Sequence, residues 1–110
     1  MTSTDLCLRL GDDHPFAPAE RLFRQMAAER LDILSTAWIR LEKGQQVREA
    51  LADVRHVAHV VAGTAPSLGH AGLGEQADRL ERLSTESAIR EEVLGALRPF
   101  MAYLADLAED

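Results

Sequence analysis

Between residues 45 and 68, apolar side chains recur in alternating steps of four and three, and this spacing restricts the possible fold more than any other feature. The positions that share it are Val47, Leu51, Val54, Ala58, Val61, Ala65 and Leu68. Such steps place side chains on one face of an α-helix, whereas one face of a strand needs steps of two. The spacing therefore predicts a single helix of about 24 residues, starting near Gln45 and ended by Gly69.

Three other segments have helical spacing and are separated by turn residues. The first is predicted to begin at Pro18, a favoured residue type for a first helical turn, and to end near Lys43-Gly44. The other two carry apolar positions from Leu73 to Leu83 and from about Glu86 to Leu107. Each is long enough for at least three helical turns, so we expect four helices in all.

The apolar positions of these three segments define the rest of the expected core. They are Leu22, Met26, Ile33, Ala37 and Leu41, broadened by Phe23, Leu34 and Trp38, in the first segment; Leu73, Ala77, Leu80 and Leu83 in the next; and Ile89, Val93, Leu97, Phe100, Leu104 and Leu107 in the last. Ser84 or Thr85 is placed to cap the last helix. Proline lacks a backbone donor, so we expect a bend at Pro66 and a kink or broken turn at Pro99.

Four amphipathic helices with short connections predict an all-α fold, an antiparallel four-helix bundle. We assign the bundle to residues 18–110 as a single domain and residues 1–17 to a short N-terminal extension. Only residues 6–10 resemble a strand, and only weakly. Aromatic residues make up 5% of the chain, so the core of the bundle is expected to be mainly aliphatic.

Charge and composition argue against several classes of function. The formal net charge is −6, which leaves no surplus of cations to bind a nucleic-acid backbone. No apolar run approaches the length of a membrane span, and the N-terminal residues lack the basic start of a signal peptide. Cys7 is the single cysteine, so no internal disulfide can form. We therefore expect a cytoplasmic protein that binds neither nucleic acid nor membrane.

The outer face of the helix at 45–68 carries a histidine among small residues. His59 lies one residue past the apolar seam, about 100° around the helix. Its neighbours on that face are Ala52, Arg55, His56, Ala62, Gly63 and Pro66. A glycine within a helix costs about 1 kcal/mol relative to alanine, so a surface that a partner must approach closely would explain Gly63.

Other interpretations of His59 remain open from this face alone. A histidine beside an apolar seam is commonly a boundary residue with no chemical role. His56 and His59 have a spacing that can hold zinc, but a zinc site needs three or four ligands and the nearest acids on that face are Glu49 and Asp53. We therefore predict no metal site.

The segment from Ala58 to Gly69 resembles the phosphorylation motif of histidine-containing phosphotransfer domains. In that family the phosphorylated histidine is followed by an apolar residue, a glycine, small residues and an apolar-glycine pair at fixed positions. Those positions are filled here by His59, Val61, Gly63, Thr64, Ala65, Leu68 and Gly69. Leu73, Ala77 and Leu80-Glu81 continue the resemblance into the next helix.

The resemblance implies roles for individual residues. His59 would accept the phosphoryl group. Glu81 matches the acid that, in the similar phosphotransfer domain of chemotaxis histidine kinases, hydrogen-bonds the inner ring nitrogen, so it would orient His59. The family often has lysine three residues after the histidine, where this chain has Ala62. Arg55, one turn earlier, could supply the positive charge instead.

The resemblance also implies partners. His59 would exchange a phosphoryl group with an aspartate of a response-regulator receiver domain, which would dock over Ala52, His56, Ala62, Gly63 and Pro66. The receiver would bring Mg²⁺, so we expect no cofactor bound to this chain. A sensor histidine kinase could also load His59, and the chain itself would be a relay and not an enzyme. We expect a monomer.

The alternative is a phosphorylation-silent module of the same fold that binds or inhibits a kinase or a receiver, and the missing lysine favours it. The sequence leaves open the pathway and whether the chain is a free protein or a domain of a larger kinase.

Overall fold

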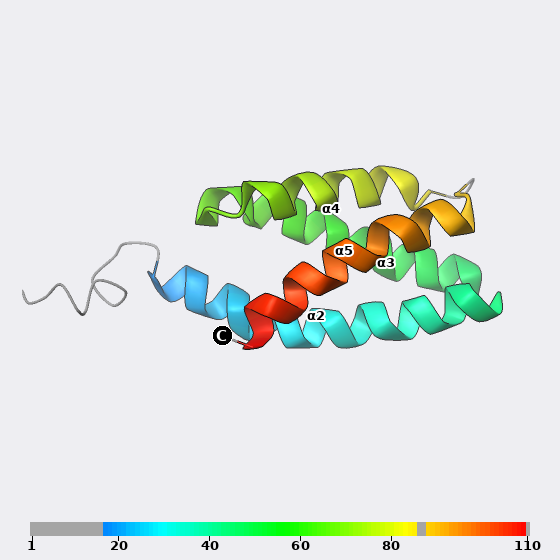
Figure 1. Ribbon diagram of the computed structural model, residues 1–110, viewed down its shortest axis with the longest axis horizontal. Coiled ribbons are helices and arrows are strands. Elements are labelled where there is room, and N and C mark those ends of the chain that lie inside the picture. Colours follow the sequence, from blue (N-terminus) through cyan, green and yellow to red (C-terminus); the bar gives the residue numbers. More distant parts are fainter. Residues whose placement is uncertain (1–16, 86–87, 110) are drawn as a thin grey trace, which may run out of the picture.

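The computed structural model describes residues 17–85 and 88–109, and all regular structure in those residues is helical (Figure 1). The order of elements is α2 (Ala17–Lys43), α3 (Val47–Thr64), the short 3₁₀ helix η2 (Pro66–Leu68), α4 (Ala71–Leu83) and α5 (Arg90–Glu109). The predicted all-α four-helix fold is therefore confirmed. The weak strand at 6–10 and all of the N-terminal extension except Ala17 lie outside the described residues, and Ala17 is the first residue of α2.

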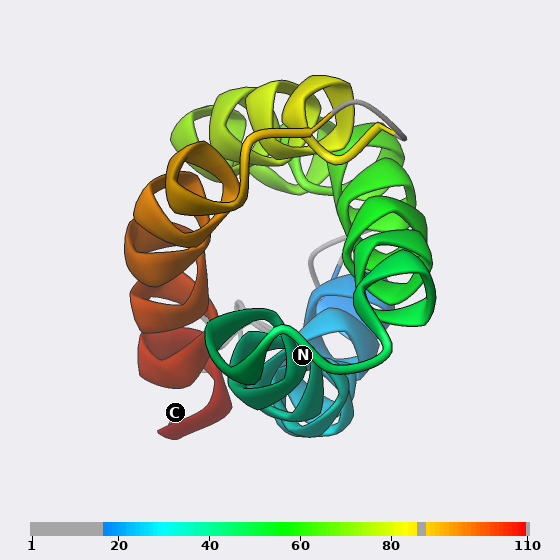
Figure 2. The same ribbon diagram turned by 90° about the vertical axis from the view of Figure 1, so that its right-hand side faces the viewer.

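The four long helices form a closed ring when the bundle is seen from its end (Figure 2). Each helix packs against its two neighbours in the order α2, α3, α4, α5, and α5 returns to α2. Consecutive helices run in opposite directions (Figure 1). This arrangement lets every helix bury one apolar stripe toward the axis and leaves its other side exposed.

The centre of the bundle is aliphatic, as the composition predicted. Its fully buried side chains of largest volume are Phe100, Leu34, Leu41, Leu73, Leu80, Leu97, Leu104, Val54, Val61, Val93 and Ser84. The seam predicted for the helix at 45–68 is buried along its middle, from Leu51 to Ala65, and its end residues Val47 and Leu68 are partly exposed. Steps of four and three therefore identified the inward face of α3 correctly.

The predicted inward face of α2 is confirmed near the C-terminal end of the helix, where its apolar positions are completely buried, but it is wrong at two other positions. Leu22 and Ile33 are exposed, and the residues that follow them, Phe23 and Leu34, are buried. The apolar arc of this helix is wider than the face that the bundle covers, so spacing alone does not locate its centre. Leu22 and Ile33 lie at the exposed edge of that arc.

The second predicted helix is shorter in the structure than its apolar pattern. Helix α3 begins at Val47, not Gln45, and ends at Thr64, after which Pro66 opens the 3₁₀ turn. Proline has no N–H to continue the helical bonding, so the regular helix stops one turn early. The chain then turns at Gly69, whose φ of 91° suits glycine. The expected bend at Pro66 is thus a change of helix type.

The last helix also differs from its prediction. It begins at Arg90 and not near Glu86, and Ile89 is exposed and not buried. Ser84 does not cap this helix, because its hydroxyl donates to the Leu80 carbonyl at 2.8 Å. Helix α5 continues through Pro99 without the expected broken turn. Pro99 lies on an exposed side of α5, where water can satisfy the carbonyl that proline leaves without a donor.

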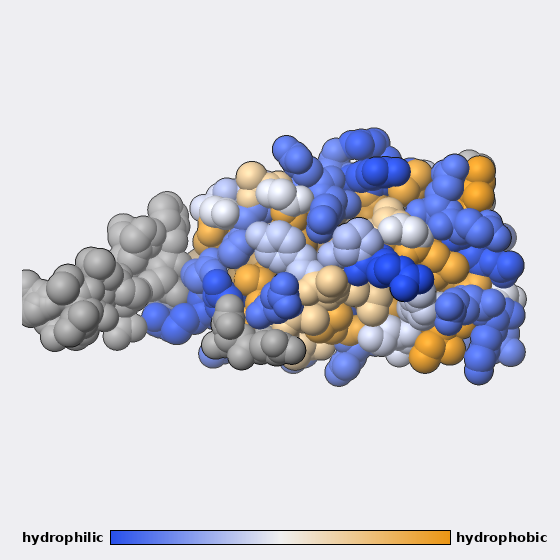
Figure 3. All heavy atoms as spheres, in the orientation of Figure 1, coloured by the Kyte–Doolittle hydropathy of each residue, from blue (hydrophilic) through white to orange (hydrophobic). Residues whose placement is uncertain are grey.

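The face that α5 and α2 share lies across the ring from the α3–α4 boundary (Figure 2). Apolar and polar residues are mixed irregularly on the face seen in Figure 3. At this side the guanidinium of Arg98 lies 5.2 Å from the ring centroid of Trp38, a cation–π contact.

Among the described residues, no helix is both long and apolar enough to cross a membrane.

Candidate functional site

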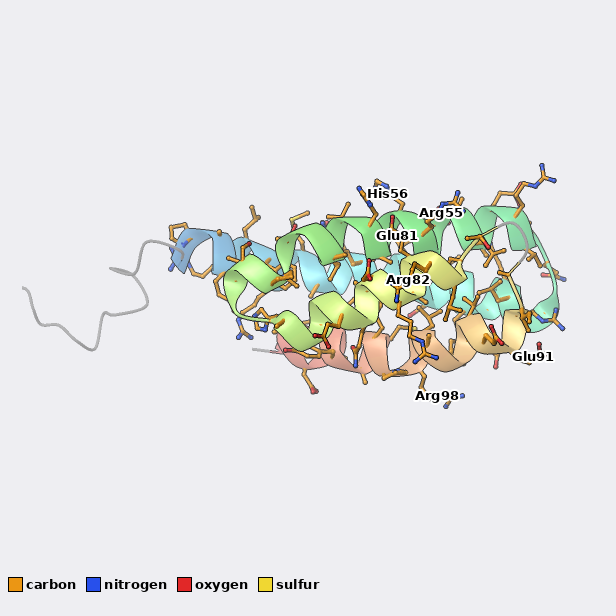
Figure 4. The ribbon with its side chains drawn as sticks, turned by 90° about the horizontal axis from the view of Figure 1, so that it is seen from above. Arg55, His56, Glu81, Arg82, Glu91 and Arg98 are labelled. Atoms are coloured by element: carbon orange, nitrogen blue, oxygen red, sulfur yellow. The ribbon has the colours of Figure 1, made fainter. Side chains whose placement is uncertain are left out.

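His59 and Glu81 meet at the boundary between α3 and α4. His59 Nδ1 lies 2.8 Å from Glu81 Oε2, and the two side chains are 73% and 30% exposed. In Figure 4, Glu81 points from α4 toward the side of α3 that carries His56. An ionised carboxylate can only accept hydrogen bonds, so Nδ1 carries the proton and donates it. In the neutral ring, Nε2 then has a free lone pair.

The buried residues just before His59 and Glu81 explain why the two side chains meet. Ala58 and Leu80 are completely buried, and each precedes one member of the pair. A step of one residue turns a helical side chain by about 100°, from the centre of the bundle to the edge between two helices. Packing of the core therefore positions the pair. The hydrogen bond itself adds little to stability, because the imidazole is mostly in water.

The residues predicted to form the surface around His59 lie on the outer side of α3 and of the turn that follows it, with one partial exception. His56 and Gly63 are exposed and Ala52 is partly exposed. A Cβ atom built on Gly63 would meet nothing within 4 Å, so the surface beside His59 is open. Ala62 is partly buried and packs against the core, so it contributes less of its surface to this side.

Pro66 is exposed but also packs closely against the next helix. A Cβ atom built on the buried Gly74 of α4 would lie 2.6 Å from Pro66 Cγ, so only glycine fits under this proline. Gly74 is the fourth residue of α4. Its role is the close approach of η2 to α4.

Arg55 bonds to the end of α4. Its Nη1 donates to the main-chain carbonyl of Ser84 at 2.9 Å. Ser84 is completely buried, and its N–H and hydroxyl both bond to the Leu80 carbonyl, at 3.0 and 2.8 Å. Arg55 therefore contacts the C-terminal end of the same helix that carries Glu81.

A second histidine–glutamate pair lies outside the predicted site. His70, which precedes α4, has Nε2 at 3.2 Å from Glu20 Oε2 and Nδ1 at 3.2 Å from the Tyr103 hydroxyl. Its ring stacks on Phe23 with centroids 5.8 Å apart. No local sequence pattern indicates this cluster, because Glu20 and Tyr103 are 50 and 33 residues away from His70.

Metal-binding groups are sparse in the part of the chain that the structure describes. No group of three or more His, Cys, Asp or Glu residues there could hold a metal ion. His56 and His59 therefore have no third protein ligand within that part.

One comparison with known proteins gives a match. The family model described as Hpt domain matches residues 21–109, which include nearly all of α2 and the whole of α3, α4 and α5. The matched region contains both His59 and Glu81. No curated protein and no solved structure matches the chain.

Proposed function

This chain belongs to the Hpt domain family, and from that premise we propose that His59 accepts a phosphoryl group from, and returns it to, an aspartate of a response-regulator receiver domain. The family supports a histidine phosphotransfer role in a phosphorelay. The observation that carries the assignment to His59 is its 2.8 Å contact with Glu81, which places the proton of the neutral ring on Nδ1 and leaves the Nε2 lone pair free on a side chain that is 73% exposed.

The position of the proton on the His59 ring determines which nitrogen reacts. The Nε2 lone pair of His59 attacks the phosphorus of the receiver's aspartyl phosphate. The Nε2–P bond forms as the P–O bond to the aspartate breaks, and the aspartate leaves as a carboxylate. The reverse transfer breaks the same Nε2–P bond. Such in-line transfer depends mainly on positioning and on neutralising charge.

Glu81 orients the imidazole and balances its charge during transfer. The Nδ1 proton stays in the hydrogen bond to Glu81 while Nε2 reacts. Bond formation at Nε2 makes the ring cationic, and the adjacent carboxylate stabilises that cation. An acid paired with a catalytic histidine acts in a similar way in hydrolases, where it also fixes the tautomer.

The partner supplies the other groups that the transfer needs. The receiver domain brings the aspartate and the Mg²⁺ that neutralises the phosphoryl oxygens, and a sensor histidine kinase can load His59. We place the protein in the cytoplasm as a carrier of phosphohistidine and not as a kinase, and we expect it to act as a monomer. The receiver docks over Ala52, His56, Ala62, Gly63 and Pro66, because small side chains there leave the imidazole uncovered.

A phosphorylation-silent module of the same fold is the second candidate. The observation that favours it is Ala62, which stands where the family often has a lysine that can approach the phosphoryl oxygens. In that case the same outer side of α3 would bind a receiver or a kinase, and His59 would take no phosphoryl group.

Phosphoryl labelling separates these two candidates. A receiver domain charged with a small phosphodonor and Mg²⁺ is incubated with the chain, and acid-labile, base-stable phosphate on the chain is measured. Label should appear on the wild type and on His70→Gln and be absent from His59→Gln. His70→Gln is the matched control, since His70 belongs to the other histidine–glutamate pair and lies outside the proposed docking surface. Receivers that bind the chain without labelling it would establish the silent module.

A further inference from the structure

Two hydrogen bonds tie α3 to α4, one helical turn apart. Residues 55 and 59 are one turn apart on α3, and residue 84, which directly follows α4, is three residues beyond residue 81. Because the helices are antiparallel, His59 meets Glu81 while Arg55 reaches the carbonyl of Ser84, at 2.8 and 2.9 Å. The two hydrogen bonds therefore lie side by side at the boundary between α3 and α4.

We propose that Arg55 is a positioning residue, which holds the last turn of α4 in place and thereby holds the Glu81 carboxylate against His59. The effect of this on phosphoryl transfer rests on the function proposed above. The effect of Arg55 on the imidazole of His59 does not rest on that function, and the experiment measures both effects. The role differs from supplying charge to the phosphoryl group, because Arg55 acts on His59 through Glu81.

The end of α4 needs such a partner. The last carbonyls of a helix have no intrahelical donor and carry a partial negative charge, which a cation or a glycine turn commonly stabilises. Here the helix is followed by Ser84 and not by glycine, with φ −90° and ψ 48°. Arg82, the basic residue in the last turn, is paired with Asp78. Arg55 provides the cation from the neighbouring helix.

The Arg55 contact reaches Glu81 through the main chain. The Ser84 N–H that points back into α4 lies 3.0 Å from the Leu80 carbonyl and 3.3 Å from the Glu81 carbonyl. Glu81, whose side chain contacts His59, therefore also contributes its main-chain carbonyl to the turn that the Arg55 bond stabilises. If that turn frays, the Glu81 backbone loosens, and an exposed hydrogen bond such as Glu81–His59 is too weak to restore it.

A double-mutant cycle tests the proposal against direct action of Arg55 on the phosphoryl group. The variants are Arg55→Met, Glu81→Gln and both together, with Arg48→Met as the control for the loss of one positive charge. Arg48 is exposed on α3 and lines the same surface hollow as Arg55. One measurement is the fraction of His59 with its proton on Nδ1, from imidazole ¹⁵N chemical shifts. The other is the rate of transfer from a charged receiver.

Arg55→Met should lower the Nδ1-protonated fraction toward its value in Glu81→Gln and slow transfer about threefold to tenfold, as a modest loss of positioning would. In the Glu81→Gln background it should change neither quantity. Arg55→Lys, which can still donate to the Ser84 carbonyl, should restore most of both, and Arg48→Met should resemble the wild type.

An unchanged tautomer in Arg55→Met would overturn the proposal. So would equal slowing by Arg55→Met with and without the Glu81 carboxylate, because that result means Arg55 acts directly on the phosphoryl group. Thermal unfolding checks that each variant is folded, and Arg55→Lys gives the comparison if Arg55→Met is not. If no receiver labels even the wild type, the proposed function fails, whereas the tautomer measurement still decides the role of Arg55.

Discussion

Within the described residues, two histidine–glutamate pairs have opposite surroundings. His59 is 73% exposed and uses one ring nitrogen, Nδ1, for Glu81. His70 is 14% exposed and uses both nitrogens, one for Glu20 and one for the Tyr103 hydroxyl. The same two residue types therefore form one pair with a nitrogen left for chemistry and one pair in which both nitrogens are occupied.

The difference shows what makes a histidine available for reaction. The His70 ring also stacks on Phe23 and meets Tyr103 edge to face, so it connects α2, the start of α4 and α5. A partner protein would have to unpack these contacts to reach the ring. His59 needs no such rearrangement, because its pair sits on an open side of α3. We infer that His70 stabilises the bundle and that His59 carries the chemistry.

Replacing each histidine by glutamine should show the difference between the two pairs most clearly. His59→Gln should remove all phosphoryl label and leave the free energy of unfolding nearly unchanged, since the side chain is exposed. His70→Gln should keep the label but lower that free energy by about 1 to 2 kcal/mol, because it weakens partly buried hydrogen bonds and ring contacts. Labelling and urea unfolding of both variants measure this. Loss of label in a folded His70→Gln variant would contradict the assignment.

The two glutamates should differ in the same way, with a smaller effect. Glu81→Gln should slow transfer about 10- to 100-fold, as is typical when the partner that orients a functional histidine is removed. Glu20→Gln should leave the rate unchanged, because Glu20 touches His70 and Arg24 at the other pair. Single-turnover transfer from a charged receiver measures both rates. Equal rates for Glu81→Gln and the wild type would mean that the 2.8 Å contact does not serve the reaction.

The open side of α3 offers a third comparison. Gly63→Lys should slow transfer about tenfold, equivalent to 1.4 kcal/mol, by placing a long side chain where the receiver approaches. Gly63→Ala adds only a Cβ atom, which meets nothing within 4 Å, and should transfer at the wild-type rate. Binding and transfer measured on both variants separate docking from chemistry. If Gly63→Lys binds and transfers normally, the receiver docks elsewhere.

The apolar spacing predicted the buried positions well in α3, where a single narrow apolar seam faces the core. The middle of the seam in α3 is buried as expected, because Val54, Ala58 and Val61 lie at the centre of a narrow apolar face. The wider arc of α2 misplaced Leu22 and Ile33, since hydrophobicity does not show which part of an arc the neighbouring helices cover.

The site was predictable only in part. Spacing placed His59 beside the seam, but the role of Glu81, 22 residues away, came from family resemblance and not from any local pattern. The bond from Arg55 to the Ser84 carbonyl had no signal in the sequence, because a main-chain acceptor is present at every residue. The partners of His70 depend on three helices packing together, which residue spacing does not specify.

The last comparison concerns two glycines that both lie within helices. Gly63 and Gly74 both lie within helices, but a Cβ atom on Gly63 meets open space, whereas one on Gly74 lies 2.6 Å from Pro66 Cγ. Gly63→Ala should therefore raise the free energy of unfolding by up to about 1 kcal/mol, through helix propensity alone. Gly74→Ala gains the same propensity but must push Pro66 away, so we expect a net loss of about 1 to 2 kcal/mol.

Urea unfolding of both variants measures whether each substitution raises or lowers the free energy of unfolding. Opposite signs would show that Pro66 is held against α4 and that the turn after α3 is fixed in place. A Gly74→Ala variant as stable as Gly63→Ala would mean that η2 moves away from α4 without cost. The turn just beyond His59 would then be adjustable, and the receiver-docking surface that includes Pro66 would form only when the partner binds.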